Sequence, residues 1–434
     1  MKELASLEAY LPVRLDKVHG LCLALGPSAL LVDSEDRLEA GSEVAFRLFL
    51  SPGSRAAGRA LVVTETEAAP EGMSRWSLKI VSWEGDSERT LQGHLSARRK
   101  DSHLAVVAQE DVESGLSQRA WERWGLPHLA LPEGRPEDMD LRTSLLGKAL
   151  NAPVMIAGMT GGSPRAGEIN RRLAVVAQEL GLAMGLGSQR VLLEQDGLVP
   201  TFQVRDLAPD VLLLANVGAI QLSLGVGVDD CRRLVDLVGA DALAVHLNPI
   251  QEMVQPEGDR DWRDLRPRIE ELISTVGVPV VIKEVGFGIS GEMARICRDM
   301  GAVAIDVGGG GGTSWARIEG LRAQDPERQA MGETFRRWGI TTGDAVIECR
   351  AALGQDFPII ATGGVRTGVD VARALALGAD IAGMALPFFR AADESEDAAT
   401  ALGRRILEEL RIAMLCSGAD GLAGMRELQL RESK

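Results

Sequence analysis

Eight short apolar runs recur along most of the chain, and their spacing constrains the fold more than any other feature. Each run is four to six residues long, and enough chain separates consecutive runs to form a helix. Runs of this kind are typical of parallel strands that are buried on both faces. They are Pro153–Ala157, Leu182–Leu186, Val211–Ala215, Ala242–Val245, Val278–Ile282, Val303–Val307, Pro358–Ala361 and Asp380–Ala385. Eight strands alternating with helices predict an α/β fold, the TIM (β/α)8 barrel.

Seven of these runs are followed on their carboxyl side by a segment with polar or glycine residues, and the eighth is followed by Leu386–Pro387. In a TIM barrel the loops leaving the carboxyl ends of the strands meet at one mouth, where catalytic groups lie. The segments are Met159–Gly162, Ser188–Arg190, Asn216, His246–Glu252, Lys283–Glu284, Gly308–Trp315, Gly363–Gly364 and Leu386–Pro387. We therefore expect one mouth to collect nearly all of the chemistry.

Residues 1–97 have a different pattern, with alternating apolar and polar positions in Val44–Leu50, Ala60–Val63 and Trp76–Val81. Such alternation with glycine and proline turns predicts a small antiparallel β-barrel or sandwich placed before the larger barrel. We therefore divide the chain into a β-rich accessory domain, 1–97, and a barrel domain, 98–434, with a linker near Gly93–Ala97.

The accessory domain's layout resembles a PilZ domain. The arginine pair that such domains use to bind cyclic di-GMP is not evident, because Arg14 is followed by Lys17 and not by a matching arginine. This favours a structural role, or binding of a protein partner, over ligand binding.

The charge of the chain excludes some classes of partner. It has 47 basic and 62 acidic residues and a net charge of −15, which argues against general attraction to nucleic acid or to anionic membranes. No apolar run reaches the roughly 20 residues needed to span a bilayer, and the amino terminus lacks a hydrophobic signal segment. We expect a cytoplasmic protein in which local groups hold any anionic ligand.

Two glycine clusters, Gly308–Gly312 and Gly363–Gly364, follow the sixth and seventh runs, and the second precedes an expected helix at Val369–Leu377. Without Cβ atoms, such turns bring backbone N–H groups close to phosphate oxygens, and a following helix adds its dipole. Tight turns alone would also use glycine. Two clusters at the expected strand ends favour a phosphate site.

Lys283 directly follows the fifth run, at the expected end of the strand, and should point into the mouth. It could stabilise an anionic cofactor such as reduced flavin, or pair with Glu284 or Asp306. FMN fits better than a dinucleotide, because no Rossmann fingerprint follows a strand.

At this point a family resemblance becomes specific. From about Arg99 to the carboxyl terminus the chain resembles the type 2, FMN-dependent isopentenyl-diphosphate Δ-isomerases. The matching motifs are Arg99-Lys100-(two residues)-His103, Ala157–Gly162, Gly187–Arg190, His246–Glu252, Lys283–Gly286, Gly310–Trp315 and Ala361–Gly364.

The resemblance implies three groups of site residues. The FMN group is Met159, Thr160, Ser188, Asn216, Lys283, Thr313, Gly363, Gly364 and Ala385. The substrate group is Arg99, Lys100, Arg190, His246, Asn248 and Gln251. Glu252 would bind a Mg²⁺ ion that bridges the diphosphate, since this hard cation prefers carboxylate and phosphate oxygens.

The implied reaction is a reversible 1,3-allylic proton shift between isopentenyl and dimethylallyl diphosphate, a step of isoprenoid biosynthesis. Protonating an alkene creates carbocation-like charge, which an electron-rich reduced flavin can stabilise. NADPH would serve only to reduce FMN. Either Gln251 or the flavin N5 region could transfer the proton, and Gln251 could instead position the substrate. The resemblance also implies a homo-oligomer, a tetramer or octamer.

Two other functions compete with this one. An FMN-dependent 2-hydroxyacid oxidase or dehydrogenase is similar in Gly363–Arg366 and Ala374–Ala379, but its chemistry needs a base histidine, and no histidine follows His246. A non-catalytic flavin-binding sensor, with the accessory domain recruiting a partner, would not need Gln251 and Glu252.

Overall fold

The computed structural model describes residues 7–16, 18–25, 28–51, 54–66, 73–88, 90–91 and 103–432. The chain divides into two compact units, Met1–Arg99 with Glu194–Asp196, and Lys100–Leu193 with Gly197–Lys434. Each unit has its own hydrophobic core. The expected linker, Gly93–Ala97, lies outside the described residues.

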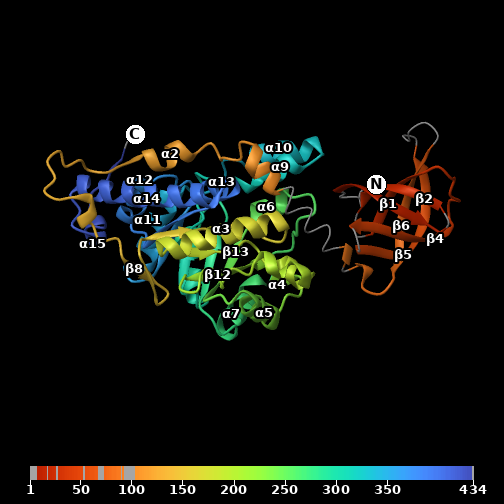
Figure 1. Cartoon of the computed structure of the whole chain (residues 1–434), viewed down its shortest axis with the longest axis horizontal. Coiled ribbons are helices and arrows are strands. Elements are labelled where there is room, and N and C mark those ends of the chain that lie inside the picture. Colours follow the sequence, from red (N-terminus) through yellow and green to blue (C-terminus); the bar gives the residue numbers. More distant parts are fainter. Residues whose placement is uncertain are drawn as a thin grey trace. The chain divides into compact units, whose positions relative to one another are not determined.

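The first unit contains a closed barrel of six antiparallel strands (Figure 1). The strands are β1 (Leu7–Leu15), β2 (Val18–Leu25), β3 (Ala29–Ser34), β4 (Glu43–Ser51), β5 (Ser54–Thr66) and β6 (Ser74–Trp83), joined in the order β1-β2-β3-β6-β5-β4. In β4 the alternate residues Val44, Phe46, Leu48 and Leu50 are buried. The predicted alternation is therefore confirmed, and closure leaves the sheet without a free edge.

The second unit is built on a closed barrel of eight parallel strands, which confirms the predicted TIM barrel. The strands are β10 (Val154–Ile156), β11 (Ala183–Gly185), β12 (Leu213–Gly218), β13 (Ala242–Leu247), β14 (Val280–Glu284), β15 (Ala304–Asp306), β16 (Ile359–Thr362) and β17 (Ile381–Met384). Each predicted run contains or overlaps one strand, and β17 pairs with β10 to close the barrel.

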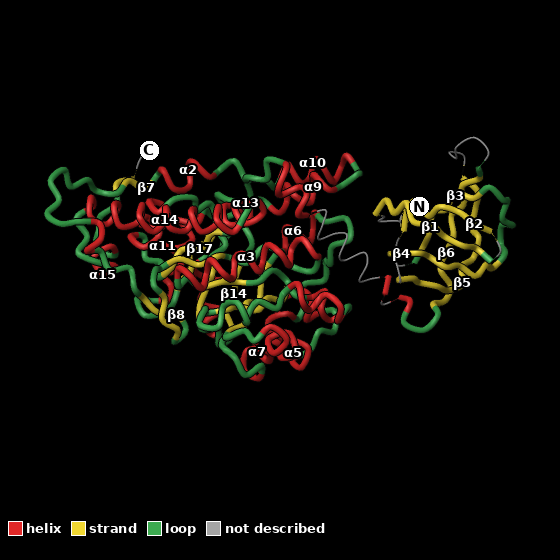
Figure 2. The backbone as a smooth tube through the Cα atoms, viewed as in Figure 1, coloured by secondary structure: helices red, strands yellow, loops and turns green. Residues whose placement is uncertain are grey.

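Helices surround this barrel, as the red segments of the tube around the yellow strands in Figure 2 show. They are α2 (Ser117–Glu122), α3 (Pro164–Leu180), α4 (Ala219–Ser223), α5 (Val228–Val238), α6 (Pro249–Val254), α7 (Leu265–Thr275), α8 (Gly291–Asp299), α9 (Trp315–Arg322), α10 (Pro326–Thr334), α11 (Thr342–Leu353), α12 (Gly368–Ala376), α13 (Leu386–Glu394), α14 (Glu396–Ser417) and α15 (Leu422–Met425). Among the described residues, no helix is both long enough and apolar enough to cross a bilayer.

Smaller elements complete the second unit. Strands β8 (Thr143–Leu145) and β9 (Lys148–Leu150) form a hairpin, and β7 (Trp124–Gly125) pairs with β18 (Arg431–Glu432). Leu145 and Leu150 of the hairpin pack with the side chains that fill the barrel interior. We infer that the hairpin closes the amino-terminal end of the barrel and leaves the carboxyl-terminal mouth for ligands.

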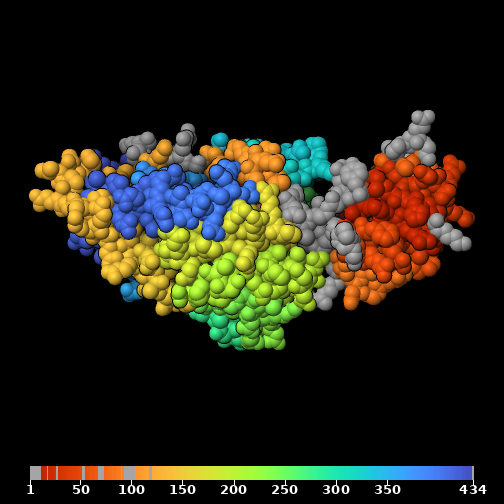
Figure 3. Space-filling model, viewed as in Figure 1, coloured from red at the N-terminus to blue at the C-terminus, as the bar shows by residue number. Residues whose placement is uncertain are grey.

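Two outer helices, α3 and α14, pack against each other on the outside of the barrel. Helix α3 begins after Ser163, whose hydroxyl caps the amide of Ala166, and ends at Gly181 with φ of +64°, a value that favours glycine. Helix α14 packs against α3 so closely that a Cβ on Gly403 would lie 2.4 Å from Leu180. In the face seen in Figure 3, the yellow side chains of α3 and the blue side chains of α14 form adjoining parts of the surface.

Candidate functional site

A layer of polar side chains lies at the mouth of the barrel. The interior below it is apolar, with Leu214, Ala244, Val281, Ala304 and Ile360 packed together. Because alternate residues of a strand share a face, the residues two positions further along also point inward. They are Asn216, His246, Lys283, Asp306 and Thr362, which we call the mouth layer.

The mouth layer corrects one detail of the prediction. Asn216, His246 and Lys283 were expected in loops or at strand ends, but β12, β13 and β14 each continue at least one residue beyond them. Parallel pairing of Gly218 with His246 and of His246 with Lys283 extends the sheet to this level. The three side chains are therefore held by regular strands.

Hydrogen bonds fix the two sides of the mouth layer. His246 Nδ1 lies 2.8 Å from Asn216 Oδ1, and Asn216 Nδ2 donates to the carbonyl of Leu186 at 2.9 Å. On the other side the Thr362 hydroxyl donates to the carboxylate of Asp306. Lys283 Nζ donates to the carbonyl of Glu284 at 3.0 Å. The layer thus offers one ammonium group within a fixed polar frame.

The predicted FMN residues on the first loops come together beside this layer. The amide of Gly187 donates to the carbonyl of Thr160 at 3.1 Å, and the amide of Gln189 donates to the carbonyl of Asn216 at 2.9 Å. Ser188 lies between these two contacts, and Met159, half-buried, immediately precedes Thr160. These contacts bring the carboxyl ends of the first three barrel strands together.

The two predicted glycine clusters are in backbone contact. Gly363 has φ of +114° and Gly364 has φ of +71°. A Cβ on Gly364 would lie 2.3 Å from the carbonyl oxygen of Gly311, and one on Gly312 would lie 2.5 Å from the amide nitrogen of Gly364. Glycine is therefore required here by both backbone angle and space, as a phosphate cradle needs.

Thr313 and Ala385 extend this surface. The carbonyl of Thr313 lies 2.7 Å from where Gly286 would carry a Cβ, so the loops after β14 and β15 touch. Ala385 precedes α13 and packs on the apolar interior of the barrel. All nine predicted FMN residues lie at the mouth end of the strands.

Replacing Gly364 with alanine should weaken FMN binding by about 100-fold or more, because the added methyl group forces the two glycine loops apart. Fluorescence titration of the apoprotein with FMN measures this effect. Gly277→Ala is a matched control, since Gly277 has φ of +90° but nothing within 4 Å of an added Cβ. Equal losses in both variants would mean that backbone strain, and not the cradle, explains the result.

The loop after β13 brings together the predicted metal and substrate groups. Asn248 Nδ2 donates to Glu252 Oε1 at 2.9 Å and to Gln251 Oε1 at 3.2 Å. Glu252 Oε2 accepts the amide of Asp259 at 2.9 Å. Asn248 Oδ1 is buried and has no hydrogen-bond partner. A buried acceptor beside a carboxylate suits a bound cation.

No group of three or more His, Cys, Asp or Glu side chains that could hold a metal ion occurs in the part of the chain that the structure describes. A Mg²⁺ ion often keeps several waters and binds through one or two carboxylates plus substrate phosphates. Glu252 with Asn248 fits that arrangement, and the diphosphate and water would supply the other ligands.

Glu319 is a site residue that the sequence did not reveal. Its side chain is fully buried in α9, and Oε1 accepts Gln251 Nε2 at 2.9 Å and lies 2.9 Å from His103 Nε2. Arg322 pairs with its other oxygen. Burial raises the pKa of Glu319, but His103, Arg322 and Gln251 outweigh burial and lower the pKa to about 2. Glu319 is therefore a carboxylate that orients Gln251.

A weak signal for Glu319 exists in the sequence. It lies four residues after Trp315, in a helix whose Ala316, Ile318 and Gly320 are buried. A lone acid on a buried helical turn needs a partner. The imidazole of His103 also stacks edge-on against Trp315, with ring centroids 5.4 Å apart. This gives Trp315 a packing role beside the mouth.

The remaining substrate residues divide into described and undescribed positions. Arg190 lies 3.6 Å from the carboxylate of Asp259, the residue whose amide binds Glu252. It is therefore connected to the Glu252 loop. Arg99 and Lys100 lie outside the described residues. Their predicted contact with substrate stays a prediction.

The chain segment after His103 is tied across the mouth. Residues 110–114, which we call the strap, follow a helical stretch at 103–109. The amide of Ser114 donates to the carbonyl of Gly312, and the amide of Ser314 donates to the carbonyl of Val112, both at 2.8 Å. The strap thus pairs with the loop that carries the first glycine cluster.

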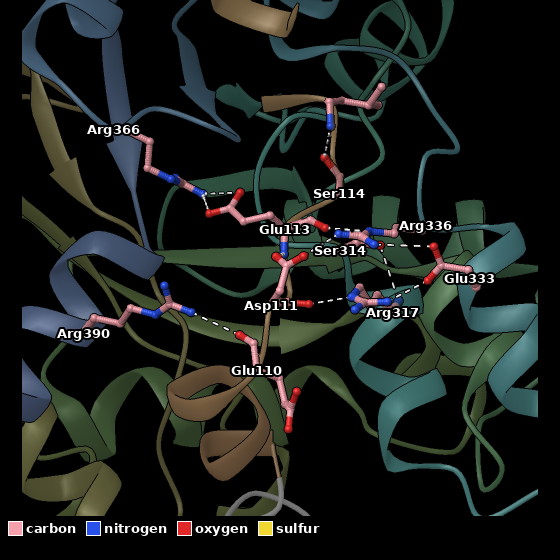
Figure 4. A network of polar contacts seen from close by, with 11 residues as sticks. Glu110, Asp111, Glu113, Ser114, Ser314, Arg317, Glu333, Arg336, Arg366 and Arg390 are labelled. Carbon is pink, nitrogen blue, oxygen red and sulfur yellow. Dashed lines mark hydrogen bonds and ion pairs between the residues drawn. The ribbon is translucent and has the colours of Figure 1, made fainter. Parts of the chain in front are cut away.

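Four arginines hold the strap from the barrel side (Figure 4). Arg366 binds both carboxylate oxygens of Glu113, at 2.7 and 3.0 Å. Arg336 donates to the carbonyl of Glu113 at 2.8 Å, while Arg317 and Arg390 donate to strap carbonyls. Arg366 lies two residues after the second glycine cluster and binds Glu113 of the strap. The strap in turn follows the helical stretch that begins at His103, so it connects the expected phosphate site to His103.

Glu284 holds the loop after β14. One of its carboxylate oxygens accepts the amides of Val285, Gly286, Phe287 and Gly288. Burial raises the pKa of Glu284 to about 7, although the amides of Phe287, Gly286 and Val285 and the charge of Lys283 favour the charged form. The group is structural, because every donor it uses belongs to its own loop.

Comparison with known proteins identifies the family. The model of a family described as FMN-dependent dehydrogenase matches residues 232–432. A Rickettsia bellii protein named isopentenyl-diphosphate delta-isomerase is 45% identical over 337 residues, covering 78% of this chain and 98% of the relative. A Nostoc protein of the same name is 48% identical over 320 residues, covering 74% and 91%.

Solved structures support the fold. A mandelate oxidase with (S)-2-phenylpropionate has a TM-score of 0.54 at 20% identity and covers 79% of this chain and 98% of its own. Mandelate oxidase with 3,3-difluoro-2-hydroxy-3-phenylpropionic acid gives the same TM-score and identity. This likeness concerns the fold, whereas the identity of the isomerases extends over nearly their whole length. The chain belongs to the type 2, FMN-dependent family of isopentenyl-diphosphate delta-isomerases.

Proposed function

We propose that this protein interconverts isopentenyl and dimethylallyl diphosphate with reduced FMN, Mg²⁺, and NADPH as the flavin reductant. The observation that carries the proposal is the chain of contacts from Asn248 through Gln251 to Glu319, placed beside the polar mouth layer. Curated relatives of 43–48% identity bear the name of this activity. The chain itself supplies binding, orientation and charge for an alkene diphosphate.

The diphosphate end is held by charge. In the proposal Glu252, with Asn248 Oδ1, holds Mg²⁺, and Arg190 neutralises phosphate oxygens. Arg99 and Lys100 are assigned to the same end by family resemblance. His246 contacts Asn216 through Nδ1, which fixes the orientation of the imidazole ring at the mouth, and the family resemblance assigns this residue to the substrate.

The alkene end lies by Gln251. When bound, reduced FMN supplies an electron-rich ring that stabilises positive charge developing on the substrate. Gln251 donates to a carboxylate through Nε2 and accepts from Asn248 through Oε1, so its amide cannot rotate freely. We propose that Gln251 sets the position of the allylic carbons and takes part in moving the proton.

The proposed FMN site uses residues of the same mouth. Lys283 faces the mouth from strand β14, and Thr160, Ser188 and Asn216 border the mouth. Gly363 and Gly364 form the proposed cradle for the phosphate. Thr313, Met159 and Ala385 complete the predicted set. The residues fit FMN, since the cradle excludes side chains and the ammonium of Lys283 suits an anionic ring.

An anaerobic assay tests the function. Purified protein receives FMN, Mg²⁺, catalytic NADPH and isopentenyl diphosphate, and dimethylallyl diphosphate and NADPH are measured together. Because the isomerisation has no net redox change, product should exceed oxidised NADPH by at least about 100-fold. FMN binding with no product would contradict the proposal and favour the flavin-binding sensor, and lactate or mandelate oxidation would favour the oxidase.

The state of assembly and the accessory domain are further parts of the proposal. We propose a homo-oligomer, a tetramer or octamer, and a protein-binding or structural role for the six-stranded barrel of the first unit. Light scattering of the full chain tests the oligomeric state. Deletion of the six-stranded barrel, followed by the same assay, tests whether catalysis depends on the accessory domain.

A further inference from the structure

Asp306 is the one acidic side chain of the mouth layer, and the family resemblance assigns it neither to FMN nor to substrate. It ends β15, is 1% exposed, and is paired in parallel register with Lys283 of β14. Its Oδ1 accepts the hydroxyl of Thr362 and the amide of Gly308, the latter at 3.3 Å. A buried carboxyl therefore lies beside the layer's only ammonium group.

Charge balance explains this placement. Burial raises the pKa of Asp306 above its ordinary value, and the charge of Lys283, the Thr362 hydroxyl and the Gly308 amide oppose this rise without cancelling it. Lys283 itself uses its ammonium for a single hydrogen bond to a carbonyl oxygen, that of Glu284. Because a charge inside a protein requires an opposite charge or ordered dipoles, the Asp306 carboxyl, when ionised, is placed to compensate the ammonium of Lys283 on the neighbouring strand.

This pairing limits the positive charge available to a ligand. With Asp306 ionised, the pair is neutral overall. With a neutral group in its place, Lys283 would present a full positive charge to the mouth. An anionic ring would then be stabilised more than a neutral ring, because opposite charges within about 4–6 Å favour the charged form.

We propose that Asp306 is a positioning residue that fixes the charge Lys283 presents to bound FMN and thereby sets the preference of the site for reduced over oxidised flavin. The inference rests on the FMN site of the proposed function. It assigns Asp306 a role through Lys283 and no contact with the reacting atoms.

The test measures the dissociation constants of oxidised and reduced FMN, under anaerobic conditions, for wild type and Asp306→Asn. Asparagine keeps the shape and an oxygen to accept from Thr362 and Gly308. We expect the ratio of the two constants to change about tenfold in favour of reduced FMN, about 30 mV for a two-electron couple. A purely structural role would raise both dissociation constants by the same factor and leave their ratio unchanged.

Thr362→Val provides an independent variant should the asparagine variant fail to fold. It removes the hydroxyl that stabilises the carboxylate but keeps the carboxyl group, so the ratio should change in the same direction by about threefold. The inference would be overturned if the ratio of the two dissociation constants stayed within about 1.5-fold of wild type in each variant that folds and binds FMN. Failure of wild-type protein to bind FMN would instead overturn the proposed cofactor site.

Discussion

Replacing Glu252 with glutamine should lower kcat/KM for isopentenyl diphosphate by about 1000-fold, equivalent to about 4 kcal/mol of lost transition-state stabilisation. Glutamine keeps the shape and can still accept from Asn248, but it removes the negative charge that the proposed Mg²⁺ requires. The measurement is the initial rate as a function of Mg²⁺ concentration. The Mg²⁺ concentration that gives half of the maximal rate should be higher for the variant than for wild type.

Two controls separate metal binding from folding. FMN affinity of Glu252→Gln should equal that of wild type, because the glycine cradle lies on other loops. Glu292→Gln removes an exposed acid at the start of α8 and should leave both activity and Mg²⁺ dependence unchanged. Wild-type kinetics in the Glu252 variant would show that the carboxylate binds only its neighbours Asn248 and Asp259.

The barrel could be predicted because its strands are buried on both faces, which leaves a continuous apolar signal in the sequence. The predicted run Val278–Ile282 and strand β14, Val280–Glu284, illustrate the remaining error. Apolar character marks where a strand is buried, but pairing with neighbours decides where it ends. Lys283 and Asn216 are polar, so the pattern ended too early at the positions that matter most for ligands.

The candidate site could be predicted only where its residues lie close together along the chain. Asn248, Gln251 and Glu252 occupy one helical turn, and the glycine clusters are contiguous. Glu319 is 68 residues from its partner Gln251, and no local pattern records that contact. From the sequence, Asp306 is no more than one of two candidate partners for Lys283. Contacts between distant segments depend on the barrel bringing strands β13, β15 and helix α9 to one mouth.

Replacing Glu319 with glutamine should lower kcat by about 10- to 100-fold, because Gln251 and His103 lose the charge that orients them and small displacements in an active site have such effects. Stability should fall by about 3–5 kcal/mol, since Arg322 loses a buried partner. Glu257→Gln is the matched control. It removes the other carboxylate of Arg322, at 3.2 Å, but leaves Gln251 and His103 in place, so kcat should be nearly unchanged.

The stability effect should depend on pH in a defined direction. The pKa of Glu319 falls from 4.5 to about 2 on folding, so its stabilising contribution is complete above pH 4.5 and is lost as the pH falls toward 2. Urea midpoints of wild type and Glu319→Gln should therefore differ most near pH 7 and converge below pH 3. A difference that stays constant from pH 7 to pH 3 would mean that the glutamine acts through packing, and that the carboxylate charge does not hold His103, Gln251 and Arg322 together.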